Sequence, residues 1–305
     1  MKTLVTLIAL LAAIPVCATG LESNQPSLRW TMLNVTPNEG QADCNLLEMP
    51  DHAMILIDVA DGYDAPDVAV RQLHRLGVKH LSLVVISHFH RDHYGRLLDL
   101  IRSGVAVDNV VLNLPDRRIT LPEMPWGCDW DDVQAMLAEL RKRQIPYHIP
   151  AAGESLYHYS AGDGTAADIE VLCAYDGMNT PVGETDVNDT SIILRVSFGK
   201  TRILFTGDLN WKLGAYLATS DLDLRADLVK APHHGTDNLA PDAFFDRTQA
   251  QAIFVPSPKK LWESARSKRL RNYVIEHKIP VYVSGLNGIV TTTLTGKGYV
   301  IETER

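Results

Sequence analysis

The chain has 305 residues, of which 46% are hydrophobic and 22% charged, and these are the proportions of an ordinary globular protein. They exclude a low-complexity disordered chain, a collagen and a polytopic membrane protein. The formal net charge of -8 at pH 7 argues against a dedicated nucleic-acid binder, although a local basic patch could still bind phosphate.

The first residues of the chain predict a targeting segment. After a basic start, residues 4–16 are apolar apart from one threonine. This run is too short for a comfortable membrane span and is typical of a secretory signal peptide. We therefore predict that residues 1–18 are removed and that residues 19–305 form a single secreted or periplasmic domain without a membrane span. The alternative is a lipoprotein signal that uses Cys17.

Three cysteines remain after this cleavage, namely Cys44, Cys128 and Cys173. An odd number allows at most one internal disulfide, and the sequence leaves the pairing open. Because none of them has Cys-x-x-Cys spacing, a structural zinc site is not expected. We predict that they are small buried hydrophobic side chains.

The first half of the chain alternates short apolar runs with amphipathic stretches. Strands are predicted at residues 28–35, 45–47, 53–59, 81–86 and 110–114. Helices are predicted at residues 67–76, from residue 97 to 101, and at residues 130–144, where apolar side chains recur at helical spacing.

The second half has the same texture. Strands are predicted at residues 169–174, 191–197, 202–206, 228–231, 253–255 and 281–283, followed by a hairpin of residues 288–293 with 299–302. A basic helix is predicted around residues 264–277. No linker interrupts the pattern, which favours an α/β fold with two sheets and outer helices in one domain.

Polar residues with metal-binding or acidic side chains follow several of these strands. Asp58 follows one apolar run, a histidine-rich segment follows the next, Asp208 follows a third, and the pair His233–His234 follows a fourth. Ligand sites in α/β proteins lie where the carboxyl ends of strands share an edge. We therefore expect these residues to converge.

The strongest signal is the segment His88-x-His90-x-Asp92-His93. Residues two apart on an extended chain face the same way, so His88 and His90 can bind one metal ion together. If the chain then turns into a helix near Asp92, Asp92 and His93 swing towards a second ion. Imidazole and carboxylate ligands suit zinc, with manganese or iron as alternatives.

This segment, written SHFHRDHYG, resembles the signature of the metallo-β-lactamase superfamily. The later segments TGD and VKAPHHGT resemble the family's bridging acid and its last histidine. The resemblance extends over about residues 28–300 and implies a four-layer αββα sandwich. It also implies two divalent metal ions, with zinc expected and manganese possible.

A narrower resemblance concerns the hydrolase domain of competence DNA-uptake (ComEC) proteins and the phosphorylcholine esterases. It lies in the segments NEGQAD, MILIDVADG and NDTS and in the doubled histidine. There are departures: the usual third histidine is replaced by Asn188, the branch's Asn-x-Tyr-x-His-Pro stretch is not recognisable, and the transmembrane channel is absent.

The resemblance implies a site assignment. Its implied metal ligands are His88, His90, Asp92, His93, Asp208, His233 and, as a weaker amide ligand, Asn188. Its implied catalytic or supporting groups are Asp92, His234 as a proton donor, and Asp58 as a hydrogen-bond partner of a ligating imidazole. The roles of His233 and His234 could be exchanged, because only one of two adjacent residues is expected to ligate.

Several of these positions also have a purely structural interpretation. Asn188 could simply begin a turn, and Asp58 and Asp43 could be turn carboxylates. A basic group around the predicted helix is either a solvated face or a phosphate-binding rim; it consists of Lys259, Lys260, Arg266, Lys268, Arg269 and Arg271.

These residues predict metal-assisted hydrolysis, in which a metal-bound hydroxide attacks the substrate. The narrower resemblance favours a phosphoester, especially a phosphodiester, of a small molecule or of the cell envelope, with nucleic acid a less favoured substrate. One alternative is an amide or lactone hydrolase of the β-lactamase type. The other is a binding module whose metal centre has decayed. The sequence does not indicate the oligomeric state.

Overall fold

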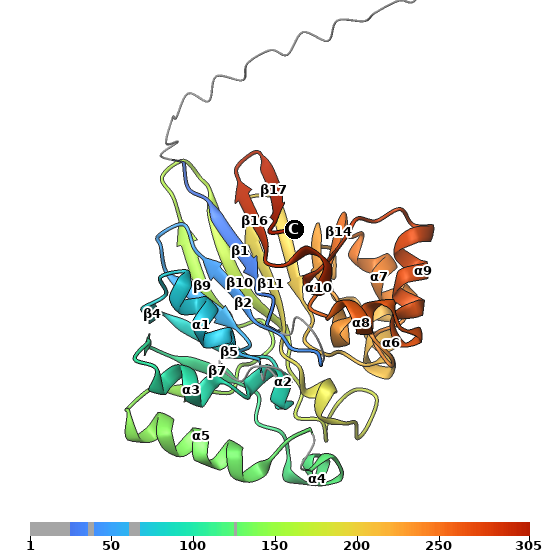
Figure 1. The fold of residues 1–305 in the computed structure, drawn as a ribbon. Coiled ribbons are helices and arrows are strands. Elements are labelled where there is room, and N and C mark those ends of the chain that lie inside the picture. Colours follow the sequence, from blue (N-terminus) through green and yellow to red (C-terminus); the bar gives the residue numbers. More distant parts are fainter. Residues whose placement is uncertain (1–24, 36–39, 61–67, 125–126) are drawn as a thin grey trace, which may run out of the picture.

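A computed structural model describes residues 25–35, 40–60, 68–124 and 127–305. Two large β-sheets pack face to face in it, and helices cover their outer faces, as Figure 1 shows. This is the αββα arrangement of an α/β protein that the sequence predicts. The proposed signal segment, Cys17 and the first residue of the helix predicted at 67–76 lie outside the described residues.

The first sheet has the strand order β17-β16-β1-β2-β3-β5-β7-β8. Pairing is antiparallel from β17 to β3 and parallel from β3 to β8. The strand bounds are β1 Leu28–Met32, β2 Asn45–Glu48, β3 Met54–Ile57, β5 Leu83–Ile86, β7 Val110–Leu112, β8 Tyr147–His148, β16 Val290–Thr295 and β17 Gly298–Thr303.

The second sheet has the order β15-β14-β13-β12-β11-β10-β9, antiparallel from β9 to β12 and parallel from β12 to β15. Its strands are β9 Ser155–Ser160, β10 Ala166–Cys173, β11 Ile193–Phe198, β12 Thr201–Phe205, β13 Leu228–Lys230, β14 Ala252–Val255 and β15 Val281–Val283. A separate small sheet pairs β4 His80–Leu81 with β6 Ala106–Val107. Each large sheet therefore has an antiparallel and a parallel part.

Helices cover the two outer faces. The first sheet carries α1 Val68–Arg75, α3 Leu97–Arg102 and α5 Trp130–Lys142, and the second carries α6 Trp211–Thr219, α7 Asp242–Thr248 and α9 Lys268–Glu276. Shorter helical turns are α2 Arg91–Tyr94, α4 Arg117–Thr120, η1 Leu121–Glu123, η2 Val187–Thr190, η3 Pro232–Gly235, α8 Lys259–Glu263, η4 Ala265–Ser267 and α10 Ser284–Asn287.

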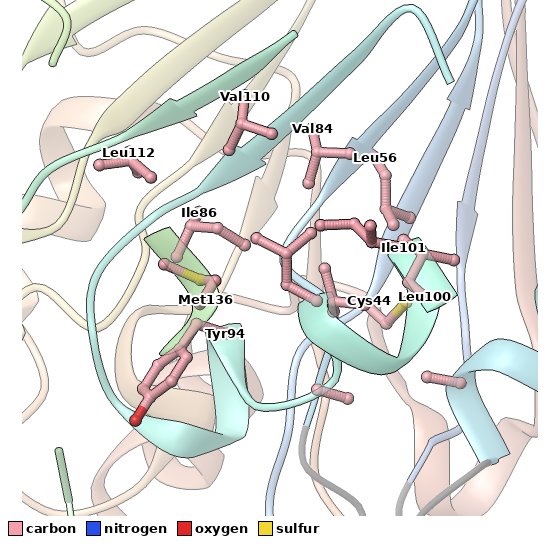
Figure 2. Packing of buried hydrophobic residues seen from close by; sticks show 14 of the residues in the cluster. Cys44, Leu56, Val84, Ile86, Tyr94, Leu100, Ile101, Val110, Leu112 and Met136 are labelled. Carbon is pink, nitrogen blue, oxygen red and sulfur yellow. The ribbon is translucent and has the colours of Figure 1, made fainter. Parts of the chain in front are cut away.

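Three buried clusters fill the spaces between the four layers. The central cluster lies between the sheets, where the Trp30 ring packs against Phe205 and Phe254 with centroid distances of 5.0 and 4.2 Å. A second cluster joins the first sheet to its helices; Figure 2 shows Val84 and Ile86 of β5 with Leu100 of α3 and Met136 of α5. The third joins the second sheet to α6, α7 and α9.

The described cysteines are buried in these clusters, as the sequence predicts, and all three are unbridged thiols, which the sequence left open. Cys44 and Cys128 belong to the cluster under the first sheet, and Cys173 to the one under the second. Burial raises the pKa of Cys128 and of Cys173 to about 12, so both thiols stay protonated at neutral pH.

Most predicted strands are present with ends shifted by one to three residues, and the basic helix predicted around residues 264–277 is present as η4 followed directly by α9. Residues 259–276 form α8, the turn η4 and α9, with a break at Ser264, whose hydroxyl accepts a hydrogen bond from the Arg266 amide. The short helices α6 and α7 and the strand β9 were not predicted. Within the described ranges, no helix has both the length and the apolar character needed to cross a membrane.

Candidate metal centre

The predicted strand ends meet where the parallel parts of the two sheets face each other. Asp58 follows β3 and His88 follows β5 in the first sheet, whereas Asp208 follows β12 and His234 follows β13 in the second. Both strand pairs are parallel, so their carboxyl ends share one edge. The site therefore lies between two sheets, and neither sheet alone contains all of its groups.

The histidine-rich segment has the local shape that its spacing predicts. The backbone is extended at His90 (φ −91°, ψ 145°), and the one-turn helix α2 begins at Arg91. His88 and His90 therefore precede the helix, on extended chain, whereas Asp92 and His93 belong to its first turn. His93 is fully buried, and its ring centroid lies 4.1 Å from that of His88.

Four donor groups form a closed, buried end of the centre. Nε2 of His234 lies 3.2 Å from Nε2 of His93, 3.2 Å from Asp92 Oδ2 and 3.2 Å from Asp208 Oδ2, and His93 Nε2 lies 3.3 Å from Asp208 Oδ1. Ligands bound tetrahedrally to zinc at 2.0–2.1 Å are separated by about 3.3–3.4 Å. The spacing of these donor atoms therefore fits a divalent ion.

Asp58 contacts the closed end through the side of the His93 ring that faces away from the other donor atoms. Its Oδ2 accepts a hydrogen bond from His93 Nδ1 at 2.8 Å, and Ser87 donates to the same carboxylate through its backbone N (2.7 Å) and its hydroxyl (2.8 Å). These contacts fix the His93 ring with Nε2 facing the centre. Asp58 has a positive φ of 62°, a backbone conformation that non-glycine residues seldom adopt. It positions His93 and does not face the cavity.

The charges of the closed end perturb one another. Burial lowers the pKa of His93, but the carboxylates of Asp208 and Asp58 outweigh burial and hold it well above its usual value. Burial likewise lowers the pKa of His234, yet Asp208 and Asp92 raise it to about 9. Binding of a divalent ion at these ring nitrogens would therefore compete with protons.

The TGD segment has a clear steric basis. Gly207 has a φ of 50°, and a Cβ atom there would lie 2.4 Å from the Ser191 hydroxyl. The same hydroxyl accepts a hydrogen bond from the Asp208 backbone N at 2.9 Å. Glycine is therefore required for the close approach that places the Asp208 carboxylate.

The adjacent histidines occupy different places from those assigned in the sequence analysis. His233, His234 and Gly235 all have positive φ values, so the chain makes a left-handed turn instead of continuing as a strand. His234 is the ring that joins the cluster, with its Nδ1 held 3.1 Å from the Pro256 carbonyl. His233 lines the neighbouring cavity, and its buried Nδ1 has no hydrogen-bond partner.

The other end of the centre opens into a cavity of about 820 Å³. His90, Asp92, Asn188 and His233 line it. Three buried donor atoms here, His88 Nε2, Asn188 Oδ1 and His233 Nδ1, have no hydrogen-bond partner. Buried donor atoms of this kind, without a hydrogen-bond partner and close to a carboxylate, have the chemistry to bind a cation.

Three residues of the site carry no role in the predicted ligand set. Glu123 of η1 lies 2.5 Å from His90 Nε2 through its Oε2, which leaves Nδ1 as the ring nitrogen that can face a metal. Lys230 and Asp43 form a buried ion pair beside Asp208. Lys230 could have been noticed in the sequence, because it is a charged residue inside the apolar run DLVKAP. Glu123 could not, because nothing in the surrounding sequence sets it apart from other glutamates.

The basic group around α8 and α9 divides between two roles. Lys260 and Arg266 line the cavity, and the Arg266 Nε donates to Asp237 Oδ2 at 2.9 Å. Arg269 instead pairs with Asp242 and donates to the carbonyls of Leu239 and Ala240. Lys259 lies 3.8 Å from Glu263 on the exposed side of α8. Cations therefore flank the cavity on one side, without forming one continuous basic surface.

A sequence profile of the metallo-β-lactamase superfamily matches residues 37–252. No curated protein sequence matches significantly. Among solved structures, the chain is similar to the metallo-β-lactamase fold protein YhfI from Bacillus subtilis, with a TM-score of 0.53 and 14% identity over 87% of this chain and 99% of that one.

The chain is also similar to the E377D mutant of the CmlA β-hydroxylase, with a TM-score of 0.51 and 14% identity over 88% of this chain and 54% of that one. It thus spans about half of that enzyme. At such identities the likeness concerns the fold alone, and because the same architecture carries a hydroxylase, the chemistry has to be argued from the site.

Proposed function

The chain belongs to the metallo-β-lactamase superfamily of metal-dependent hydrolases, and from this premise we propose that it hydrolyses phosphoester bonds, most readily phosphodiesters, with two divalent ions. The observation that carries the proposal is the composition of the cavity. The exposed side of the histidine–aspartate centre and the cations Lys260 and Arg266 line the same space. An anionic substrate is attracted to such a space.

The proposed ligand sets follow the two ends of the centre. The closed end has Asp92, His93, Asp208 and His234, and the cavity end has His88, His90, Asp208 and the amide oxygen of Asn188. Divalent ions in such a site act as Lewis acids and lower the pKa of water to about 7. Because the cavity end has an amide oxygen where the superfamily commonly has imidazole, we expect it to accept manganese as well as zinc.

The protein's own residues orient the substrate. Lys260 and Arg266 lie on the side of the cavity formed by α8 and η4, where they can bind non-reacting phosphate oxygens. The His233 ring lines the same space, and we assign it the exchange of a proton with the leaving group. We assign this proton-exchange role to His233 in place of His234, because the His234 ring is held inside the closed end.

The substrate's location is part of the proposal. The N-terminal residues 1–18 have the layout of a signal peptide, so we propose an exported enzyme that acts on a small-molecule or cell-envelope phosphoester. The narrower resemblance to the competence DNA-uptake and phosphorylcholine esterase branch supports phosphoester chemistry.

The test is a turnover assay of the metal-loaded mature protein, in parallel with elemental analysis. Bis-nitrophenyl phosphate, a panel of phosphodiesters and nitrocefin are the substrates. We expect bound zinc or manganese and turnover of phosphodiesters only. Turnover of nitrocefin alone would contradict the proposal in favour of amide hydrolysis. Tight metal binding without turnover of any substrate would indicate a binding module.

A further inference from the structure

Lys230 is a buried ammonium group inside the metal centre. It ends β13, its side chain is 2% exposed, and its Nζ lies 2.5 Å from Asp43 Oδ2 and 3.4 Å from Asp208 Oδ1. Nζ also donates to the Gly207 carbonyl at 2.9 Å. Lysine is almost never fully buried unless it is paired, and here every partner belongs to the centre or to the turn that carries Asp208.

Its partner Asp43 is equally enclosed. The Asp43 side chain is fully buried, its Oδ1 accepts a hydrogen bond from Asn45 at 3.2 Å, and its backbone N donates to the Asp92 carbonyl at 3.0 Å. Donor atoms of Asp43, His93, Asp208 and His234 all lie within 4.8 Å of one another. By distance alone Asp43 could therefore be a metal ligand. Its Oδ2 accepts no hydrogen bond of normal geometry, but it lies 2.5 Å from the Lys230 ammonium as an ion pair.

We propose that Lys230 is a permanent cation of the centre, which holds Asp43 outside the ligand set and competes with the bound metal for the negative charge of Asp208. Lys230 is then a positioning residue that does not touch the substrate. The inference rests on the divalent ions of the proposed function, but it concerns how tightly they bind and not which bond is broken.

Two consequences follow from the charges. In the metal-free protein, Lys230 compensates a group of buried carboxylates that would otherwise repel one another, so the fold does not depend on metal. In the loaded protein, the same charge repels a divalent ion at a short distance through protein of low polarity. Removal of this charge should therefore tighten metal binding and destabilise the metal-free fold.

The experiment compares the wild type with Lys230→Met, Asp43→Asn and the double variant. Zinc affinity is measured by competition with a chromophoric chelator, and the melting temperature is measured on the metal-free proteins. We expect Lys230→Met to bind zinc on the order of tenfold more tightly and Asp43→Asn on the order of tenfold more weakly. The double variant should return towards the wild-type affinity, because the pair is lost without a change in net charge.

The metal-free melting temperature gives a second readout. Lys230→Met should melt well below the wild type, because Asp43 is left buried without its counter-ion, and the double variant should regain much of the loss. If Lys230→Met does not fold, the comparison of Asp43→Asn with the double variant makes the same test, and the added loss of Lys230 should again tighten zinc binding.

Lys142→Met is the matched control, because it removes the same charge from the surface of α5, where the side chain is 77% exposed. It should leave the zinc affinity unchanged. Equal affinities in all four proteins would overturn the inference, as would a double variant that binds zinc far more weakly than the wild type, since Asp43 would then be a ligand. Failure of the wild type to bind zinc would instead contradict the metal centre itself.

Discussion

The two ends of the metal centre differ in how completely the protein itself satisfies their polar groups. At the closed end, His93, Asp208 and His234 lie in contact with one another, and all are buried. His93 also contacts Asp58, and Asp208 also contacts Lys230. At the cavity end, His88 Nε2 and Asn188 Oδ1 are buried without partners. The closed end therefore resembles a preorganised part of the core, whereas the cavity end is incomplete without a ligand.

This difference suggests that the two ends bind metal with different affinities. Ion pairs among buried groups hold the geometry of the closed end even without metal. A metal ion that binds there would have to compete with protons on the histidine rings. The cavity end has fewer charges, an amide donor and access to solvent. We therefore expect tight metal binding at the closed end and weaker, exchangeable binding next to the substrate.

The largest effect is expected from Asp208→Asn, because Asp208 is the carboxylate that both proposed ligand sets share. Turnover should fall by about three orders of magnitude or more, equivalent to roughly 4 kcal/mol of transition-state stabilisation. Metal content measured by elemental analysis should fall at both ends. Retention of two ions per chain would show that Asp208 does not link the ends.

The next effect separates the adjacent histidines. His234→Ala should lose the ion of the closed end and about two orders of magnitude or more in kcat, because it removes a buried ligand. His233→Ala should keep the metal content of the wild type, with its loss confined to turnover. Metal analysis and steady-state kinetics on both variants make the measurement, and the reverse pattern would restore the sequence-based assignment of His233 as the ligand.

A smaller effect is expected from Glu123→Gln at the cavity end. The Glu123 carboxylate raises the pKa of His90 against the lowering effect of burial, and it fixes the ring orientation. Loss of the charge should weaken metal binding at this end by about tenfold and leave the closed end unchanged. The d–d spectrum of the cobalt-substituted protein should change for one ion only. Glu139→Gln is the control, because this carboxylate pairs with Arg143 on α5.

The smallest effect is expected from Asn188→His, which should make the two ends more alike. An imidazole at this position should tighten zinc binding at the cavity end by roughly tenfold and reduce the preference for manganese. Competition against a chelator with each metal gives both affinities. If both affinities stay at wild-type values, Asn188 lies outside the ligand set and only shapes the turn before β11.

The fold could be predicted from local patterns in most places where burial is uniform. The apolar run of β5 is covered on both faces and reads as a strand without further information. The helix α5 has a regular apolar stripe and the N-cap Asp129, whose carboxylate accepts a hydrogen bond from the Asp131 amide. By contrast, β9 is half exposed at an edge and carries no clear alternation of apolar residues.

The candidate site divides in the same way. The sequence by itself determined which strand ends carry ligands and that His88 and His90 precede a helical turn, because these depend on spacing within a few residues. It could not determine which of His233 and His234 faces the centre, since that depends on a left-handed turn that local propensity disfavours.

Only the tertiary structure decided the role of residues whose partners are remote in sequence. Glu123 reaches His90 from a turn 33 residues away, and Lys230 meets Asp43 across the boundary between the two sheets. A charged side chain is buried only where another element supplies its counter-charge, and one sequence does not specify which elements will meet. Local spacing therefore indicates which segments carry the candidate ligands, and the packing of the two sheets decides which residues face the centre and which charges surround them.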